Sequence, residues 1–456
     1  MQDHAQPRFG TDGVRGRAIV EITPEFCMSL GRAVAQVLRP ERLVIAHDPR
    51  LSGPILEAAF AAGAAAEGVE VQQLGMLPTP AVAVIAAREG VPGVVVTASH
   101  NGYSDNGIKV FAVGGSKVSD ADQQTIESRL RSPSFERVAA PAGRLVRRQD
   151  AEAIYAEHIT GLFPPVALEG LRIVIDTANG AMSEVAPRIL ESLGADVIVM
   201  NNSPDGTNIN DRCGATAPQA LCEFVANIAA STHDGGLAVD LAFAFDGDGD
   251  RLIAVDERGR IVDGDRLIAL SALDRRHRGQ LLGDGVVVTV MTNLGFHRAM
   301  KAADIDVVTT PVGDRAVLEA MALHGYVLGG EQSGHIIHRD LATTGDGLLA
   351  AIELARMYRQ RHRETGEPFS VMAAAVMQTF PQVLSNVPVG SRTVDPARDL
   401  ASAIAAAEAE LGSDGRVLVR TSGTESLIRI MVEASTEEHA RQVADRLSAA
   451  VRAHYG

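Results

Sequence analysis

Cysteine is scarce in this chain of 456 residues, which has three: Cys27, Cys213 and Cys222. They are too few and too unevenly spaced for a disulfide framework, and no C-x-x-C pair indicates a zinc site. The sequence therefore predicts a protein of the cytoplasm without disulfide bonds.

Long apolar runs and a leader sequence are missing as well. Spanning a bilayer takes roughly 20 apolar residues, whereas the apolar stretch at 58–66 is short and interrupted. The first ten residues are polar and lack the basic, apolar and small-residue order of a signal peptide. We therefore expect no membrane as a partner.

Positive charge is also low, and the sequence has no phosphate-binding motif of the Walker type. The formal net charge is −15, whereas nucleic-acid binding depends on Lys and Arg side chains that neutralise phosphates. The sequence thus argues against nucleic acid as a partner and leaves open an anionic small substrate at a local group of basic residues. No G-x-x-x-x-G-K-[ST] sequence occurs, so an ATP-driven kinase is disfavoured.

Apolar strands, by contrast, are abundant, and hydrophobic residues make up 46 % of the chain. Three segments repeat an apolar strand, a loop with Thr or Asn and a helix-like stretch: 94–102, 173–180 and 286–295. Continuous apolar strands that alternate with helices are typical of sheets covered on both faces. After Phe369 the pattern changes to an alanine-rich helix and two strands.

These patterns predict an α/β fold of three similar domains with mixed or parallel sheets, followed by a smaller C-terminal α+β domain. The length is consistent with three or four domains. The expected domains span residues 1–153, 154–256, 257–368 and 369–456.

One serine follows a buried apolar strand. In the segment VVVTASHNG, residues 94–102, the strand delivers Ser99 into a polar loop that ends in glycine. Such a serine can carry a phosphoryl group, although the same residues could form a simple polar turn. Lys109 follows soon afterwards, and this nearby cation favours the functional interpretation.

Three carboxylates crowd the end of another apolar strand. The segment FAFDGDGDR places Asp246, Asp248 and Asp250 at alternate positions. Mg²⁺ takes oxygen ligands and is commonly held by a few carboxylates and a phosphate oxygen. A divalent metal would also relieve repulsion between the aspartates and a phosphoserine, which carries about −1.5 to −2 charge. The sequence therefore predicts one Mg²⁺ site.

Two other interpretations of this acidic loop are weaker. Glu257 falls at the twelfth position of an EF-hand, but Arg251 stands where that loop needs glycine, and both flanks read as strands. A haloacid-dehalogenase-type phosphotransferase would use Asp246 as its nucleophile, with Asp248 beside it, yet it has no use for the Ser99 loop. A merely solvated acidic turn is disfavoured because strand ends in α/β sheets are the usual ligand sites.

Three further polar loops contain groups suited to an anionic sugar. Arg15 stands among glycines near the N-terminus, where the spacing does not fit a dinucleotide fingerprint. Glu331, Ser333 and His335 lie between glycines, which permit close approach of a ligand to the backbone. A turn near the C-terminus combines hydroxyls, backbone N–H groups and arginines that could cradle a phosphate. Its residues are Arg420, Ser422, Gly423, Thr424 and Arg429. Taken singly, these segments could be a mobile terminus, a core histidine and an ordinary hairpin turn.

Taken together, and in their order along the chain, these motifs resemble those of the α-D-phosphohexomutase family. The resemblance extends from Phe9 to Glu433. The segments that add to the resemblance are ANG at 178–180, PDGTNIN at 204–210, VGDR at 312–315 and TTGDG at 343–347. The resemblance implies four domains around a central cleft and an isomerase that transfers a phosphoryl group within its substrate. Gln332 favours glucosamine phosphate over glucose or mannose phosphate.

The resemblance also implies roles for the residues. Ser99 would be the phosphoserine and, through its phosphate, a ligand of Mg²⁺ together with the three aspartates. Glu331 and Ser333 would bind sugar hydroxyls, and the C-terminal turn would bind the distal phosphate. The groups implied to surround the reacting phosphoryl are Arg15, Lys109, Arg251 and His335, with Lys109 and His335 as candidates for proton transfer.

The implied reaction converts glucosamine 6-phosphate to glucosamine 1-phosphate through a bisphosphate that turns over in the cleft. This step would feed UDP-N-acetylglucosamine and peptidoglycan synthesis in the cytoplasm. A sugar 1,6-bisphosphate would prime the serine, and a homodimer is one option. A phosphomannomutase or phosphoglucomutase of the same family and a non-catalytic sugar-phosphate sensor remain as alternatives.

Two positions depart from the family pattern. Gly102 and Ser426 stand where the family usually has proline. Glycine should loosen the Ser99 loop relative to proline, because more backbone conformations are open to it. Neither change removes a reacting group.

Overall fold

The computed structural model describes residues 9–10, 13–131, 141–231, 238–390, 394–422 and 426–455. The chain forms two compact units. The first comprises Met1–Thr289 and Val308–Ala373, and the second comprises Val290–Val307 and Ala374–Gly456. Among the described residues, no helix has both the length and the apolar character needed to cross a membrane.

The first sheet lies near the N-terminus and has seven strands. Its strands are β1 (Phe9–Gly10), β2 (Gly13–Arg17), β3 (Arg42–His47), β4 (Glu70–Met76), β5 (Gly93–Val96), β6 (Asp105–Phe111) and β7 (Leu145–Arg147). They are ordered β1-β2-β6-β5-β3-β4-β7. β3, β4, β5 and β7 run parallel, and β6, β2 and β1 extend one edge antiparallel.

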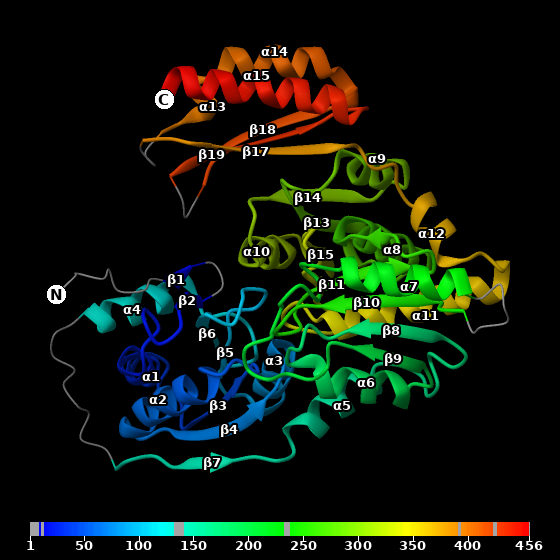
Figure 1. Ribbon diagram of the computed structural model, residues 1–456. Helices are drawn as coiled ribbons and strands as arrows, with labels where there is room; N and C mark the ends of the chain where they lie inside the picture. The colour runs from blue at the N-terminus through cyan, green and yellow to red at the C-terminus, as the bar shows by residue number, and fades with distance from the viewer. Residues whose placement is uncertain are drawn as a thin grey trace. The chain divides into compact units, whose positions relative to one another are not determined.

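Helices cover both faces of this sheet (Figure 1). They are α1 (Pro24–Leu38), α2 (Gly53–Ala66), α3 (Thr79–Glu89) and α4 (Asp120–Arg131). α1 starts sharply because Pro24 suits the first helical position and Thr23 Oγ1 accepts the Phe26 N–H at 3.2 Å. α1, α2 and α4 share one core with the sheet, while α3 packs against β3 and β5. The apolar run of β5 is therefore buried on both sides.

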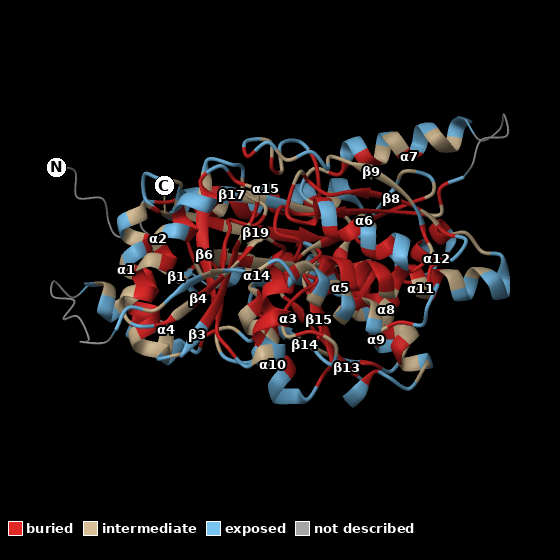
Figure 2. Ribbon diagram, turned by 90° about the horizontal axis from the view of Figure 1, so that it is seen from below, coloured by how far each residue is buried: buried red, intermediate tan, exposed pale blue. Residues whose placement is uncertain are grey.

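The second sheet follows the same plan with five strands. Its elements are α5 (Ala151–Gly161), β8 (Arg172–Asp176), α6 (Met182–Ser192), β9 (Asp196–Met200), α7 (Gln219–Ser231), β10 (Leu241–Phe245), β11 (Leu252–Asp256) and β12 (Ile261–Val262). In the order β12-β11-β10-β8-β9, β10, β8 and β9 are parallel and β11 and β12 antiparallel. Every residue of β10 is buried, whereas α7 buries only Leu221 and Val225 and is largely exposed (Figure 2).

The third sheet has four strands in the order β14-β13-β15-β16. The elements of this region are α8 (Gly264–His277), η2 (Leu282–Asp284), β13 (Gly285–Thr289), α9 (Leu294–Ala302), β14 (Asp306–Thr310), α10 (Asp314–His324), β15 (Leu328–Gly330), β16 (Ile336–His338), α11 (Gly347–Thr365) and α12 (Phe369–Ala375). β13 and β15 are parallel, and β16 is antiparallel to β15. The short turn between β15 and β16 contains Glu331, Ser333 and His335.

The last sheet belongs to the second unit and is antiparallel throughout, in the order β17-β19-β18. Its elements are β17 (Gln382–Pro388), α13 (Pro396–Asp399), α14 (Ala401–Leu411), η3 (Gly412–Asp414), β18 (Arg416–Thr421), β19 (Leu427–Glu433) and α15 (Glu437–Tyr455). α15 packs on β17 and β19. Three mixed α/β sheets followed by an antiparallel sheet match the predicted fold class.

Candidate active site

Ser99 lies in the loop between β5 and β6 and is fully buried. Its φ of 53° is left-handed, a conformation uncommon for residues other than glycine. The Ser99 N–H donates to Thr97 Oγ1 at 2.9 Å, and the hydroxyl donates to Asp246 Oδ2 at 2.6 Å. The serine that the sequence singled out therefore contacts the acidic loop directly.

The acidic loop connects β10 to β11 at the carboxyl end of the parallel strand β10. Asp246, Asp248 and Asp250 are all buried, and they offer oxygen atoms that lie within 4.8 Å of one another. Gly249 allows the bend with a φ of 75°. The flanks are strands, as the sequence indicated against an EF-hand.

These three side chains fit a hard divalent cation. Burial and the carboxylates of Asp250 and Asp248 raise the pKa of Asp246 well above its usual range, so the cluster favours a compensating positive charge. Asp248 Oδ1 is buried and has no hydrogen-bond partner among the described residues. An anionic oxygen left in this way is suited to metal coordination, and the all-oxygen donor set is the kind that Mg²⁺ prefers.

Cationic side chains surround the acidic loop. Lys109 Nζ, from β6, lies 2.9 Å from Asp248 Oδ2 and 2.8 Å from Asp250 Oδ2. Arg251 Nε lies 3.9 Å from Asp246 Oδ2. Arg15 stands on β2, which pairs with β6. The pKa of the His100 imidazole falls to about 4 because of burial and the nearby charges of Arg251 and Arg15. The structure thus brings the predicted cations to the Ser99 loop.

The turn after β15 presents the predicted sugar-binding residues. Glu331 Oε1 accepts the Gly313 N–H at 3.1 Å, and Ser333 is exposed. The His335 side chain is buried, and neither ring nitrogen has a hydrogen-bond partner among the residues described. Its Nε2 lies 3.8 Å from Asp314 Oδ2. His335 thus keeps hydrogen-bonding capacity that a substrate could use.

The predicted phosphate-binding turn lies in the second unit, between β18 and β19. Arg420 and Arg429 are directly opposite in the antiparallel ladder, and burial and the charge of Arg429 lower the pKa of Arg420. Like charges paired across a sheet are unfavourable, so this pair favours a bound anion. Ser422 is described, whereas Gly423 and Thr424 lie outside the described residues.

The sequence interpretation missed several residues that hold the Ser99 and acidic loops. Thr79, at the start of α3, donates its hydroxyl to Asp248 Oδ2 at 2.5 Å. Arg50, just after β3, donates to backbone oxygens of the Ser99 loop. Asn210, from the PDGTNIN segment, binds the same loop. A signal existed for Arg50, because polar residues after a parallel strand commonly face a ligand site.

Comparison with known proteins agrees with this arrangement. Four family models match consecutive parts of the chain: phosphoglucomutase/phosphomannomutase alpha/beta/alpha domain I at residues 6–137, domain II at 153–259, domain III at 263–380 and the C-terminal domain at 384–450. They confirm the predicted fold of three α/β domains and a smaller last domain, while the exact boundaries stay a prediction.

Full-length relatives are similar over nearly the whole chain. The phosphoglucosamine mutase of Frankia alni is 50 % identical, over 98 % of this chain and 98 % of its own. That of Heliobacterium modesticaldum is 46 % identical, over 96 % and 98 %. A solved phosphoglucomutase/phosphomannomutase family protein of Burkholderia thailandensis superposes with a TM-score of 0.78 at 25 % identity and covers 97 % of both chains.

The fold extends to more distant structures. The Aspergillus fumigatus N-acetylphosphoglucosamine mutase, solved with GlcNAc-6P and magnesium, has a TM-score of 0.70 at 18 % identity and covers 100 % of this chain and 97 % of its own. From the four domain matches and the full-length relatives, the chain belongs to the phosphoglucomutase/phosphomannomutase family, the α-D-phosphohexomutases.

Proposed function

We propose that this chain is an isomerase that interconverts glucosamine 6-phosphate and glucosamine 1-phosphate through a phosphoserine at Ser99. The observation that carries the proposal is the 2.6 Å hydrogen bond from Ser99 Oγ to Asp246, inside a buried cluster of three aspartates and Lys109, with Arg251 nearby. The substrate follows from the full-length relatives named as phosphoglucosamine mutases.

The reaction has two balanced halves. The bond from phosphorus to Ser99 Oγ breaks while a bond forms to the free hydroxyl of the sugar monophosphate; the hydroxyl proton passes to a base, and the leaving Ser99 Oγ takes up a proton. The bisphosphate then reorients, and its other phosphoryl group passes to Ser99 Oγ, which gives up its proton while the newly freed sugar oxygen takes one up. His335 and Lys109 are the candidates for moving that proton.

The remaining residues bind and orient. Mg²⁺, when bound by the three aspartates, would neutralise charge on the transferring phosphoryl group. Arg15, Lys109 and Arg251 would surround the same group. Glu331 and Ser333 would hold sugar hydroxyls. The turn with Arg420, Ser422, Gly423, Thr424 and Arg429 would bind the phosphate that is not reacting.

A comparison of substrates tests this function. Turnover of glucosamine 6-phosphate, glucose 6-phosphate and mannose 6-phosphate is measured side by side with Mg²⁺ and a trace of sugar 1,6-bisphosphate to prime Ser99. We expect a clear preference for the glucosamine compound, and Ser99→Ala should lose nearly all turnover while still binding it. Preference for another sugar would reassign the substrate within the family. Sugar-phosphate binding without turnover by the wild type would instead indicate a sensor.

The cellular context rests on the same relatives. The product would be a precursor of UDP-N-acetylglucosamine and peptidoglycan, and the enzyme would act in the cytoplasm. A homodimer stays a prediction, which sedimentation of the purified chain can test.

A further inference from the structure

The guanidinium of Arg50 is hydrogen-bonded to the Ser99 loop. Arg50 is fully buried, in the bend that follows β3. Its Nη2 donates to Ser99 O at 2.9 Å and to Asn101 O at 2.8 Å. Its Nη1 donates to Asp105 O at 3.1 Å and also to Gly102 O. One side chain thus binds four carbonyl oxygens within the seven residues 99–105.

The fifth donor of Arg50 binds a carboxylate that is part of the same network. Nε donates to Asp48 Oδ2 at 2.8 Å, and this oxygen also accepts from Thr97 Oγ1 at 2.6 Å. Thr97 Oγ1 in turn accepts the N–H of Ser99 at 2.9 Å. A guanidinium has five N–H donors in a fixed plane, and all five are used here, so its position and that of the loop determine each other.

Ser99 needs such a constraint. A left-handed φ on a residue other than glycine persists only where the surrounding structure enforces it. This conformation accompanies the hydrogen bond from Ser99 Oγ to Asp246. Asn210, from the second α/β domain, adds its Nδ2 donor to Ser99 O at 2.9 Å and to Asn101 O at 3.0 Å. Two donor groups from different domains therefore hold the same two carbonyls.

We propose that Arg50, clamped by Asp48, is the positioning residue of the phosphoryl-carrying loop, which it holds in the conformation that aims Ser99 Oγ at the acidic cluster. The inference rests on the proposed function only in taking Ser99 as the phosphoryl carrier. It also bears on Gly102: the carbonyl at the position where the family usually has proline is bound by Arg50, which opposes the looseness expected of glycine there.

The test replaces Arg50 by lysine, which keeps the charge beside Asp48 but has three donors on a single nitrogen in place of the planar fork. Two measurements are made on the full chain with Mg²⁺. The first is the rate at which Ser99 gains phosphate from a sugar 1,6-bisphosphate, followed by intact mass. The second is amide hydrogen exchange of peptides that cover residues 97–106.

We expect Arg50→Lys to slow phosphorylation of Ser99 at least about tenfold, since a misplacement of about 1 Å can cost far more. The KM of the sugar phosphate should change little, and exchange should rise in 97–106 alone. Arg275→Lys is the matched control, because Arg275 is also buried and paired with a carboxylate, Asp340. It should leave both readouts of the Ser99 loop unchanged.

An unchanged phosphorylation rate, or exchange that rises evenly over the first domain, would overturn the proposal. If Arg50→Lys does not fold, Asn210→Gly serves instead. Glycine suits the left-handed φ of 57° at Asn210, and the change removes donors to the same carbonyls. Arg50 still holds both carbonyls in this variant, so exchange in 97–106 and the phosphorylation rate should change by much less than tenfold. A tenfold slower phosphorylation would assign the positioning of the loop to Asn210 and contradict the proposal.

The two hypotheses can fail separately. If the wild type gains no phosphate on Ser99, the proposed function is wrong, whereas the exchange data still show whether Arg50 orders the loop. If the wild type is phosphorylated and Arg50→Lys behaves like it, the function stands and the role of Arg50 is wrong.

Discussion

At the scale of single residues, the two oxygens of the Asp248 carboxylate have different environments. Oδ2 accepts the Thr79 hydroxyl at 2.5 Å and lies 2.9 Å from Lys109 Nζ, whereas Oδ1 has no hydrogen-bond partner in the described part of the chain. The Thr79 N–H also donates to Asp248 O at 2.9 Å. Thr79 therefore holds both the backbone and the side chain of Asp248, while Oδ1 stays available to the proposed cation.

Thr79→Val should weaken divalent-cation binding by about 10-fold or more, because partners that orient metal ligands contribute factors of this size. Valine keeps the volume of threonine and removes only the hydroxyl. The measurement is a Mn²⁺ titration followed by electron paramagnetic resonance, which does not depend on turnover. Thr79→Ser should keep wild-type affinity. Thr310→Val, at another buried threonine, should do so too. Equal affinity of Thr79→Val and Thr79→Ser would contradict the assignment.

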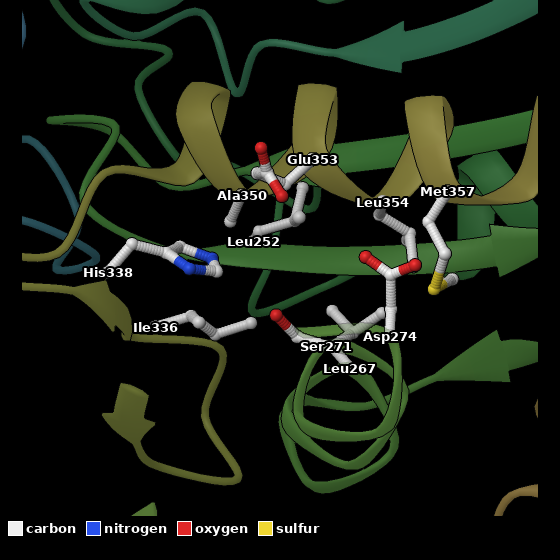
Figure 3. A pocket seen from close by; sticks show the side chains of 10 residues that line it. All are labelled: Leu252, Leu267, Ser271, Asp274, Ile336, His338, Ala350, Glu353, Leu354 and Met357. Atoms are coloured by element: carbon white, nitrogen blue, oxygen red, sulfur yellow. The ribbon is translucent and has the colours of Figure 1, made fainter. Parts of the chain in front are cut away.

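His338, on β16, is a buried titratable residue at a small cavity between α8 and α11. Ser271 and Asp274 line the cavity from α8 and Glu353 lines it from α11 (Figure 3). Arg275 Nη1 lies 3.2 Å from His338 Nδ1, and because a guanidinium can only donate, Nδ1 is the acceptor. Burial and the charge of Arg275 lower the pKa of His338 to about 3.

The depressed pKa of His338 predicts that the folded protein loses stability at acidic pH. The unfolded chain binds a proton at His338 below a pH of about 6.5, while the folded chain does not until about pH 3, so stability falls as the pH falls between these values. The loss is about 2 kcal/mol between pH 7 and pH 5. His338→Asn, whose Oδ1 can still accept from Arg275, should lack this component. Thermal unfolding at both pH values checks it, and an equal pH dependence in the two proteins would count against it.

At the scale of elements, the strands that lead to the site were predictable because their apolar runs are continuous. The runs at 94–96, 241–245 and 286–288 are buried strands in the structure, and each is followed by a polar loop. The positions of Ser99 and the three aspartates at strand ends follow from this pattern, since ligand sites in α/β sheets gather at such ends.

The contacts between distant elements were not predictable from one sequence. The hydrogen bonds of Thr79 to Asp248 and of Arg50 to the Ser99 loop join residues that no local pattern connects. Periodicity reports which face of an element is buried, but it does not say which element covers that face. The residues proposed to carry chemistry were found because charged and hydroxyl side chains are concentrated in their segments. Thr79 stands at an ordinary helix start. The place of Arg50 after a parallel strand indicates a nearby ligand site, but it does not say which loop the side chain binds.

Gly345, in the connection from β16 to α11, illustrates such a contact. A Cβ built on Gly345 would lie 2.5 Å from His335 Nε2 and 2.7 Å from two ring carbons. No side chain fits there unless the imidazole moves. The TTGDG segment therefore leaves room for the His335 ring, which sets the orientation of a proposed proton carrier.

Gly345→Ala should displace the imidazole and lower kcat by about tenfold, equivalent to roughly 1.4 kcal/mol in the barrier, with the fold retained. Gly161→Ala is the matched control, since nothing lies within 4 Å of its added Cβ, and it should leave kcat unchanged. Steady-state kinetics and circular dichroism of both variants provide the comparison. Wild-type kcat in Gly345→Ala would show that the ring position does not matter.

At the scale of the whole molecule, cationic side chains form local groups although the net charge of the chain is negative. The chain carries a formal net charge of −15, yet Lys109 and Arg251 lie at the acidic loop of the first unit, and Arg420 and Arg429 face each other in the second. A sugar bisphosphate has an anionic group at each end. Each unit therefore carries a pair of cations suited to an anionic group of this kind.

The proposed reaction predicts a conformational change on binding, because a site must admit the sugar phosphate and then retain the bisphosphate while it reorients. Small-angle scattering of the Ser99→Ala variant, which binds without turnover, should show a smaller radius of gyration with glucosamine 6-phosphate than without it. Glucosamine alone lacks the phosphate and should give no change. Adding Arg420→Ala should abolish the response, since the protein then loses a cation proposed to bind the phosphate. Identical profiles with and without the sugar phosphate would contradict the predicted change, and the bisphosphate would then have to reorient without it.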